Sequence, residues 1–186
     1  MPVALKGATS GQVTLNVPAV AGTNTLTLPA VTGNVITSAD TATVTQAMMA
    51  AGVAGNGPSF SVYSSVAQTI STATKIQFNV EEWDTANCFD NTTNYRFTPN
   101  VAGYYQINCF VRANNNAQQF TMLYKNGLNY RDVLGSTAIF GLPLSTMVFC
   151  NGTTDYLEIY FSSSVSINTV PSSSDVWFNG FLARSA

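Results

Sequence analysis

The residues whose types could support chemistry are gathered in one short acidic stretch. Glu81, Glu82 and Asp84 lie within four positions, and Asp90 follows six positions later. Clustered carboxylate oxygens suit a Ca²⁺ ion, and two opposed carboxylates could also hydrolyse a glycosidic bond. The third interpretation is an acidic loop exposed to water. The sequence favours this loop, because no other metal-binding or catalytic residues accompany the cluster.

The rest of the chain argues against an enzyme. It contains no histidine, so it cannot assemble a Ser-His-Asp or Cys-His arrangement. It also lacks the glycine-rich motifs that cradle phosphates. We therefore expect neither catalysis nor a bound cofactor.

Charge is sparse along the whole chain. Only 9% of the 186 residues are charged, and the net charge is −2. The basic residues are scattered, which argues against binding to nucleic acid, since that requires clustered Lys and Arg. No apolar run is long enough to span a bilayer, and the N-terminus has no signal-peptide pattern. We expect no membrane insertion and synthesis in a cytoplasm.

The chain has an odd number of cysteines, so at least one thiol is free or pairs between chains. Their spacing fits no zinc motif, and there is no histidine to complete one. Buried free thiols are favoured over disulfides. The three residues are Cys88, Cys109 and Cys150.

The elements that would position these residues divide into an arm and a head. We expect an extended N-terminal anchoring arm over residues 1–37, a short helix and hinge over residues 38–58, and a head domain over residues 59–186. Before the head, the only charged residues are Lys6 and Asp40. A segment of this composition cannot form a core of its own, so the arm is expected to lie on another surface.

The arm contains a short repeat and two predicted strands. Pro18–Gly22 recurs as Pro29–Gly33, and each copy follows a stretch in which apolar and polar residues alternate. Two such short strands are not stable alone in water, so they need a neighbouring subunit or a scaffold. The stretches are Val13–Val17 and Thr25–Leu28, and the candidate anchoring residues are Val13, Leu15, Val17, Leu26 and Leu28.

Between arm and head the sequence predicts a short helix over residues 38–52. Val44, Met48 and Ala51 would share one face of it. Gly52–Pro58 then predicts a hinge, because four of its seven residues are Gly or Pro.

From residue 59 onward the pattern is typical of an antiparallel sandwich. Short alternating stretches are separated by turns rich in Asn, Gly and Pro, with almost no helix signal. Weaker strand signals occur near Tyr95 and Ile139. The predicted strands are Phe60–Ile70, Lys75–Val80, Gly103–Val111, Gln119–Tyr124, Thr146–Cys150, Tyr156–Phe161 and Val176–Ala183.

Three stretches of the head, Tyr95–Tyr105, Leu123–Gly127 and Trp177–Leu182, carry a resemblance. In this order they are similar to the F-x-x-P-x-x-G-x-Y core, the N-G strand end and the F-x-G-F/Y-L last strand of one family. That family comprises the trimeric jelly-roll heads of the complement-component and tumour-necrosis-factor superfamily. One departure is Cys150–Asp155, which has extra residues where the family has L-x-x-G-D.

The resemblance implies an all-β jelly-roll head that forms a homotrimer, and some heads of the family bind calcium. Strand alternation places Tyr104 and Tyr105 on opposite faces, so one can fill the core while the other meets a partner. The candidates for the trimer contact or the core are Tyr104, Tyr105, Trp177, Phe178 and Phe181.

The arm resembles a different group. Gly7–Leu15, Pro18–Pro29 and Thr32–Val35 are similar to a segment common in tailed-phage virion proteins, both tail fibres and capsid-surface proteins. This resemblance implies a place on the virion surface for a protein made in the cytoplasm of a bacterial host.

Two functions fit these expectations. The first is a homotrimeric capsid decoration or cement protein, with the arm anchored on the major capsid protein or another virion protein and the head displayed outward. The alternative is a tail fibre or receptor-binding tip that recognises a host surface glycan or protein. Its binding loops would be Asn114–Gln119 and Ser162–Ser174.

Overall fold

The computed structural model describes residues 3–6, 9–15, 56–135 and 141–186. The chain divides into two compact units, residues 1–40 and residues 41–186. The predicted helix, most of the predicted hinge and the predicted strand Thr25–Leu28 lie outside the described residues, as do the anchoring candidates Val17, Leu26 and Leu28.

The first unit contains an antiparallel pair of strands, β1 (Val3–Lys6) and β2 (Gln12–Leu15). The turn between them includes Gly11, whose φ of 80° is in the left-handed region that favours glycine. The anchoring candidates Val13 and Leu15 lie in β2, where they pair with Leu5 and Val3. The sequence predicts β2 but not its partner β1.

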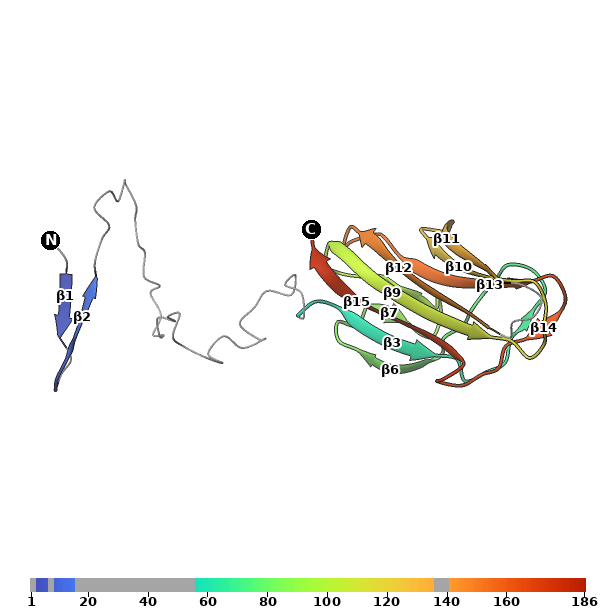
Figure 1. The fold of residues 1–186 in the computed structure, drawn as a ribbon, viewed down its shortest axis with the longest axis horizontal. Coiled ribbons are helices and arrows are strands. Elements are labelled where there is room, and N and C mark those ends of the chain that lie inside the picture. The colour runs from blue at the N-terminus through green and yellow to red at the C-terminus, as the bar shows by residue number, and fades with distance from the viewer. Residues whose placement is uncertain (1–2, 7–8, 16–55, 136–140) are drawn as a thin grey trace. The chain divides into compact units, whose positions relative to one another are not determined.

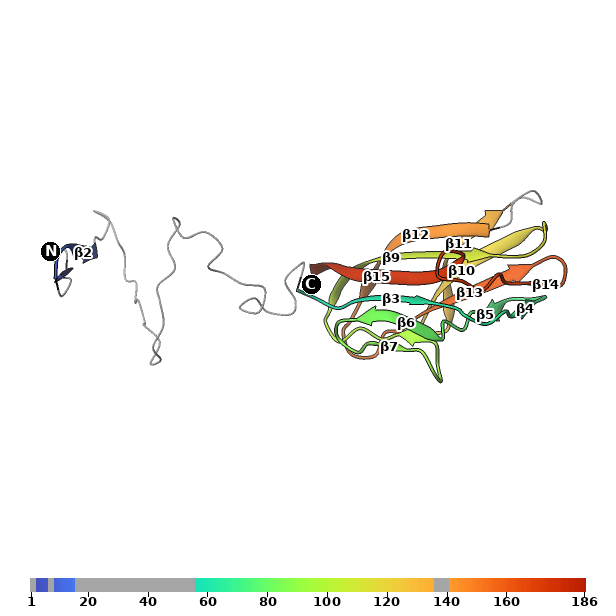
Figure 2. The same ribbon diagram turned by 90° about the horizontal axis from the view of Figure 1, so that it is seen from below.

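The head is a sandwich of antiparallel sheets (Figures 1 and 2). The first sheet has five strands and includes both the first and the last strand of the head. In order across the sheet they are β12 (Gly141–Cys150), β9 (Gly103–Arg112), β15 (Val176–Ser185), β3 (Ser59–Tyr63) and β6 (Val80–Asp84).

The second sheet has six strands, several of them only two residues long. A separate small pair, β14 (Ile167–Asn168) and β4 (Thr69–Ile70), lies at the end of the sandwich away from the C-terminus (Figure 1). The six strands are β11 (Leu128–Gly135), β10 (Gln119–Lys125), β13 (Leu157–Ser163), β8 (Arg96–Phe97), β7 (Phe89–Asp90) and β5 (Thr74–Lys75), which pairs with β13.

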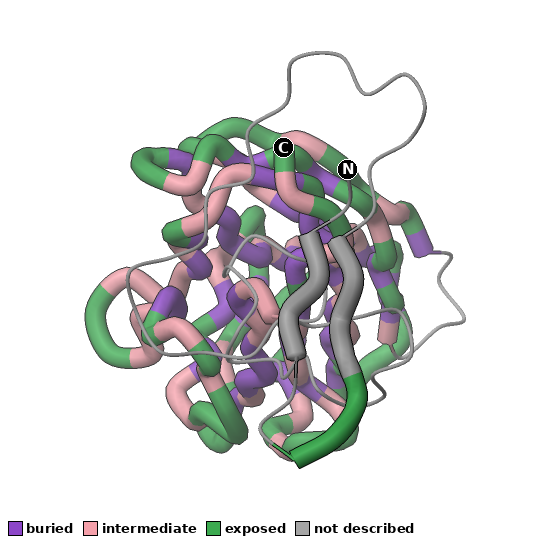
Figure 3. The backbone as a smooth tube through the Cα atoms, turned by 90° about the vertical axis from the view of Figure 1, so that its left-hand side faces the viewer, coloured by how far each residue is buried: buried purple, intermediate pink, exposed green. Residues whose placement is uncertain are grey.

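The core lies between the two sheets and follows the period-two alternation of their strands (Figure 3). Phe60 is central to it: its ring stacks on Phe97 with centroids 4.2 Å apart and meets the edge of Phe178 at 4.9 Å. These three rings come from β3, β8 and β15, so they join both sheets. Burial of these rings contributes to the hydrophobic stabilisation of the head.

The long strands follow the predictions closely, whereas two predicted boundaries are wrong. Phe60–Ile70 is two strands, β3 and β4, and Lys75–Val80 is not a strand but the link between β5 and β6. In that link Ile76 and Phe78 are buried. The link therefore shows the alternating burial of a strand although it lacks the continuous hydrogen-bond ladder of one. The antiparallel, all-β class of the head is confirmed.

No described residue lies in a helix, so none of the described segments forms a helix able to cross a membrane. At one edge of the five-stranded sheet, β12 carries Pro143. Proline has no N–H to donate, so it is tolerated on an edge strand and interrupts that edge.

Candidate functional site

The structure does not bring the four calcium candidates together. Glu82 accepts a hydrogen bond from Ser61 Oγ at 2.7 Å. Asp84 accepts from the backbone N–H groups of Ala86 and Phe89, at 3.1 and 2.6 Å. Among the described residues, no three Asp, Glu, Cys or His side chains are grouped as they would be around a metal ion.

Asp90 closes the turn that follows it. Its carboxylate accepts hydrogen bonds from the backbone N–H groups of Thr92, Thr93 and Asn94, at 2.9 to 3.1 Å. These bonds, that of Thr93 foremost, hold the pKa of Asp90 well below its ordinary value. The carboxylate is therefore a structural cap.

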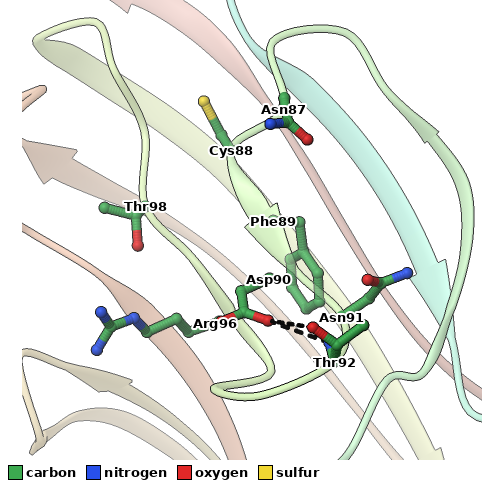
Figure 4. Close-up of a pocket in the computed structure, with 8 residues that line it drawn as sticks. All are labelled: Asn87, Cys88, Phe89, Asp90, Asn91, Thr92, Arg96 and Thr98. Atoms are coloured by element: carbon green, nitrogen blue, oxygen red, sulfur yellow. Dashed lines mark hydrogen bonds between the residues drawn. The ribbon is translucent and has the colours of Figure 1, made fainter.

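A polar cavity of about 530 Å³ lies beside this turn (Figure 4). In Figure 4, Arg96 extends away from the contact between Asp90 and Thr92. Because amide, hydroxyl and guanidinium groups line it, the cavity suits a polar ligand. The lining residues are Asn87, Cys88, Phe89, Asp90, Asn91, Thr92, Arg96 and Thr98.

Arg96 also belongs to a second feature, which we call the tyrosine surface. Its guanidinium lies over the ring of Tyr156, 4.5 Å from the centroid. The rings of Tyr124 and Tyr160 stack at 4.1 Å. The surface comprises Lys75, Arg96, Tyr124, Tyr156, Glu158 and Tyr160, from the six-stranded sheet and the residue just before β13.

One ion pair ties this surface together. Lys75 Nζ lies 3.0 Å from Glu158 Oε1, and Glu158 is buried. Burial, and then the negative charge of Glu158, raise the pKa of Tyr160. The phenol is thus neutral at physiological pH, and its hydroxyl can both donate and accept a hydrogen bond.

The outer side of the five-stranded sheet carries exposed apolar side chains, which we call the apolar face. The rings of Tyr104 and Phe149 lie 5.4 Å apart near one end of β9. Phe110 and Trp177 form a second pair at 6.4 Å, further along the same strand. The most exposed members, between 40 and 51% accessible, are Trp83, Tyr104, Met147, Phe149 and Phe181.

A polar row crosses the middle of the apolar face. Asn108 Nδ2 donates to Asn179 Oδ1 at 3.2 Å, and Ser145 Oγ donates to Asn108 Oδ1 at 2.8 Å. Gln106 Nε2 donates to Asn108 Oδ1 and Ser145 Oγ at 3.1 and 3.0 Å. The face therefore has apolar ends and a centre of hydrogen-bonding groups.

The residues expected at the trimer contact or in the core divide between the two sides of the sheet. Tyr105 and Phe178 are fully buried in the core, and Tyr105 donates its hydroxyl to the carbonyl of Val101 at 2.7 Å. Tyr104 and Phe181 are about half exposed on the apolar face, and Trp177 is partly exposed beside Phe110. Strand alternation predicts this division.

The two loops predicted to bind a receptor lie together at the end of the sandwich that carries β14. Asn114 N donates to Asn168 O, and Asn168 N donates to Asn114 Oδ1, both at 2.9 Å. Gln119 Nε2 donates to Asn115 O at 3.1 Å. The bonds between Asn114 and Asn168 join the two loops, whereas the Gln119 bond lies within the first loop.

All three cysteines are buried and free. Burial raises the pKa of both Cys109 and Cys150 to about 12. They pack as small apolar residues of the core.

The comparisons find likeness in structure alone. No family model matches the chain, and no curated protein matches it. Among solved structures, the globular domain of a zebrafish complement 1qA protein is 17% identical, with a TM-score of 0.50, covering 69% of this chain and 98% of the other.

Two further structures extend the range. The Eiger TNF of S. frugiperda is 9% identical with a TM-score of 0.56, covering 69% of this chain and 93% of the other. The vertex protein P5 of PRD1 is 13% identical with a TM-score of 0.50, covering 68% of this chain and 97% of the other. At such low identity the likeness establishes the fold: the head is a jelly roll of the kind found in complement 1q and tumour-necrosis-factor heads.

Proposed function

We propose that the chain is a structural protein of a phage virion, a homotrimeric capsid decoration or cement protein. Its N-terminal arm anchors it on the major capsid protein or another virion protein, and its head is displayed outward. The observation that carries the proposal is the apolar face of the head.

The apolar face supports self-association. Large side chains that are 40 to 51% accessible are gathered on one side of one sheet, and a gathered exposed apolar patch usually marks an interaction site. The polar row through its centre, including Asn108 and Asn179, would give such a contact a defined register. We propose that the apolar faces of two further copies of the chain cover it. The head resembles a family of heads that form trimers.

The arm and one structural neighbour support the virion setting. The unit at residues 1–40 contains the short hairpin β1–β2, and such a pair is marginal without further strands. Adding its strands to a sheet of another protein would bury its exposed backbone groups. The PRD1 vertex protein P5 has the same head fold, which is compatible with a virion surface.

A charge placed on the apolar face tests the trimer. We expect light scattering on the full chain to give three times the mass of one 19.8 kDa chain. Phe181→Glu should shift it to a single chain, because burial of an unpaired carboxylate opposes association. Leu128→Glu is the matched control, since Leu128 is also exposed but lies on β11 of the other sheet. A wild-type monomer at micromolar concentration would refute the trimer.

Deletion of residues 1–37 tests the anchor separately. The shortened protein should remain a trimer but fail to join purified particles that lack the protein, whereas the full chain joins them. Full occupancy by the shortened protein would show that the arm is not the anchor.

A further inference from the structure

We propose that the tyrosine surface and the polar cavity beside it form a binding site for a neutral glycan. This goes beyond the structural role proposed above, and it holds whichever part of the virion carries the protein. Arg96 joins the two features, since it lines the cavity and stacks on Tyr156.

The aromatic groups supply the first requirement of a sugar site. A pyranose ring has apolar C–H patches surrounded by hydroxyls, and tyrosine matches both with a flat ring and a polar tip. Tyr124, Tyr156 and Tyr160 are each partly accessible, and they are brought together from β10, the residue before β13 and β13 itself. The stack of Tyr124 on Tyr160 fixes two of the rings in place.

The surface also has polar groups that no described residue satisfies. Arg96 forms no ion pair within the described part of the chain, so its guanidinium donors are available. Glu158 uses one carboxylate oxygen for Lys75. In the described residues the only fully buried side-chain polar atom without a partner is Gln119 Oε1, so the second oxygen of Glu158 is not fully enclosed. Donors and acceptors side by side match the hydroxyls of a sugar.

The charges favour a neutral sugar. Lys75 and Glu158 neutralise each other at 3.0 Å. Asp90 lies opposite Arg96 in the register of β7 and β8. The negative charge of Asp90 is stabilised by hydrogen bonds from the turn that follows it. Lys75 and Arg96 are positive and Glu158 and Asp90 are negative, so the site has no net charge that would attract an acidic sugar.

Two other interpretations are weaker. The loops Asn114–Gln119 and Ser162–Ser174 contain no aromatic side chain to face a sugar ring, and Asn114 Oδ1 is held by Asn168 N. A peptide strand would need a long open sheet edge, but β13 pairs with β10 on one side and with β5 and β8 on the other. The edge strand β7 beside the cavity is only two residues long. Recognition at the tyrosine surface must therefore use side chains, which suits a sugar better than an added strand.

The tyrosine surface lies on the six-stranded sheet and the apolar face on the five-stranded sheet. Since the two sheets cover opposite sides of the core, association through one leaves the other accessible. Failure of glycan binding would thus leave the trimer proposal standing, and the reverse is also true.

The test is titration calorimetry on the full chain with maltohexaose, mannohexaose and chitohexaose as neutral probes and sialyllactose as an acidic one. We expect at least one neutral probe to bind. Arg96→Gln should weaken that binding about tenfold, which corresponds to the loss of one hydrogen bond to a charged group. Tyr160→Phe, which keeps the ring and removes the hydroxyl, should weaken it severalfold.

Arg131→Gln is the matched control. Arg131 also lies over a tyrosine ring, that of Tyr130 at 4.7 Å, but on β11. It should leave the affinity unchanged. The proposal is overturned if no neutral probe binds at millimolar concentration, if only sialyllactose binds, or if Arg96→Gln and Arg131→Gln have the same effect.

Discussion

Lys125 Nζ and Asp155 Oδ2 lie 2.9 Å apart, where the end of β10 meets the turn before β13. The same lysine donates to the carbonyl of Phe149 at 2.8 Å, and Asn126 Nδ2 donates to Asp155 Oδ1 at 2.7 Å. This contact therefore joins the β10–β11 hairpin, the end of β12 and the turn around Asn151. It lies at Cys150–Asp155, where the sequence departs from the pattern of the resembled family.

Asp155→Asn should destabilise the head by about 2 kcal/mol at pH 7, the value of a hydrogen bond to a charged group. Burial opposes the charge of Asp155, but hydrogen bonds from Asn126 and Lys125 lower its pKa below the ordinary value of 3.8. The stabilisation is therefore complete above the unfolded pKa and is lost as pH falls through the folded pKa. Urea unfolding at pH 7 and pH 2.5 should show the difference between variant and wild type shrinking at the lower pH. A difference that stays constant would contradict this.

Gly180→Ala should destabilise the head by about 1–3 kcal/mol through overpacking. A Cβ at this position would lie 2.6 Å from Ile107 Cδ1 and 3.0 Å from Phe60 Cε1, in the centre of the five-stranded sheet. Gly11→Ala is a control outside the head, because Gly11 lies in the other unit; its φ of 80° strains an alanine within that unit and adds no clash in the head core. Thermal unfolding of the head should shift for Gly180→Ala alone; equal shifts would rule out the packing argument.

Phe178 and Phe181 lie on the same strand but on opposite sides of the sheet. Phe178→Ala should destabilise the fold by about 3–5 kcal/mol, because it empties a fully buried site beside Phe60. Phe181→Ala should leave the fold intact and change only how the unfolding midpoint depends on protein concentration. Denaturation at several concentrations separates the two effects. Similar losses for both variants in dilute protein would contradict the assigned burial.

The cysteines should differ in reactivity. At pH 8 a thiol with a pKa of about 12, as for Cys109 and Cys150, is thiolate in only about one molecule in ten thousand. Cys88 lines the polar cavity and is 7% accessible, so iodoacetamide should label it first in the native protein. Mass spectrometry of labelled peptides would locate the adducts, and denatured protein, in which all three react, is the control. Equal native labelling would show that the core opens faster than expected.

The sequence reveals the long strands because one side of each faces the core. In β9, burial alternates residue by residue, and the period-two pattern is readable directly. The sequence does not reveal β11, because its residues are mostly exposed, which leaves no alternation to detect. The two-residue strands β7 and β14 form by pairing with other segments, so local propensity carries little sign of them, whereas β8 (Arg96–Phe97) lies at the weaker strand signal near Tyr95.

The candidate sites show the same limit. Strand alternation alone is enough to assign Tyr104 and Tyr105 to opposite sides of their sheet. The tyrosine surface could not be predicted, since Arg96 and Tyr160 are 64 positions apart and meet only through the order of strands in the sheet. Conversely, Glu81, Glu82 and Asp84 are near in sequence but are not grouped around a common point within the described residues, because strand β6 and the turn after it direct Glu82 and Asp84 to different partners.

Pro143 on the edge strand β12 affects whether closely packed heads can aggregate through their sheet edges. A continuous row of free N–H and C=O groups at a sheet edge would let neighbouring heads pair edge to edge and aggregate. Pro143 removes one donor from that row, so an incoming strand would lose register there. In dense arrays of this protein, polymerisation through the β12 edge should therefore be disfavoured.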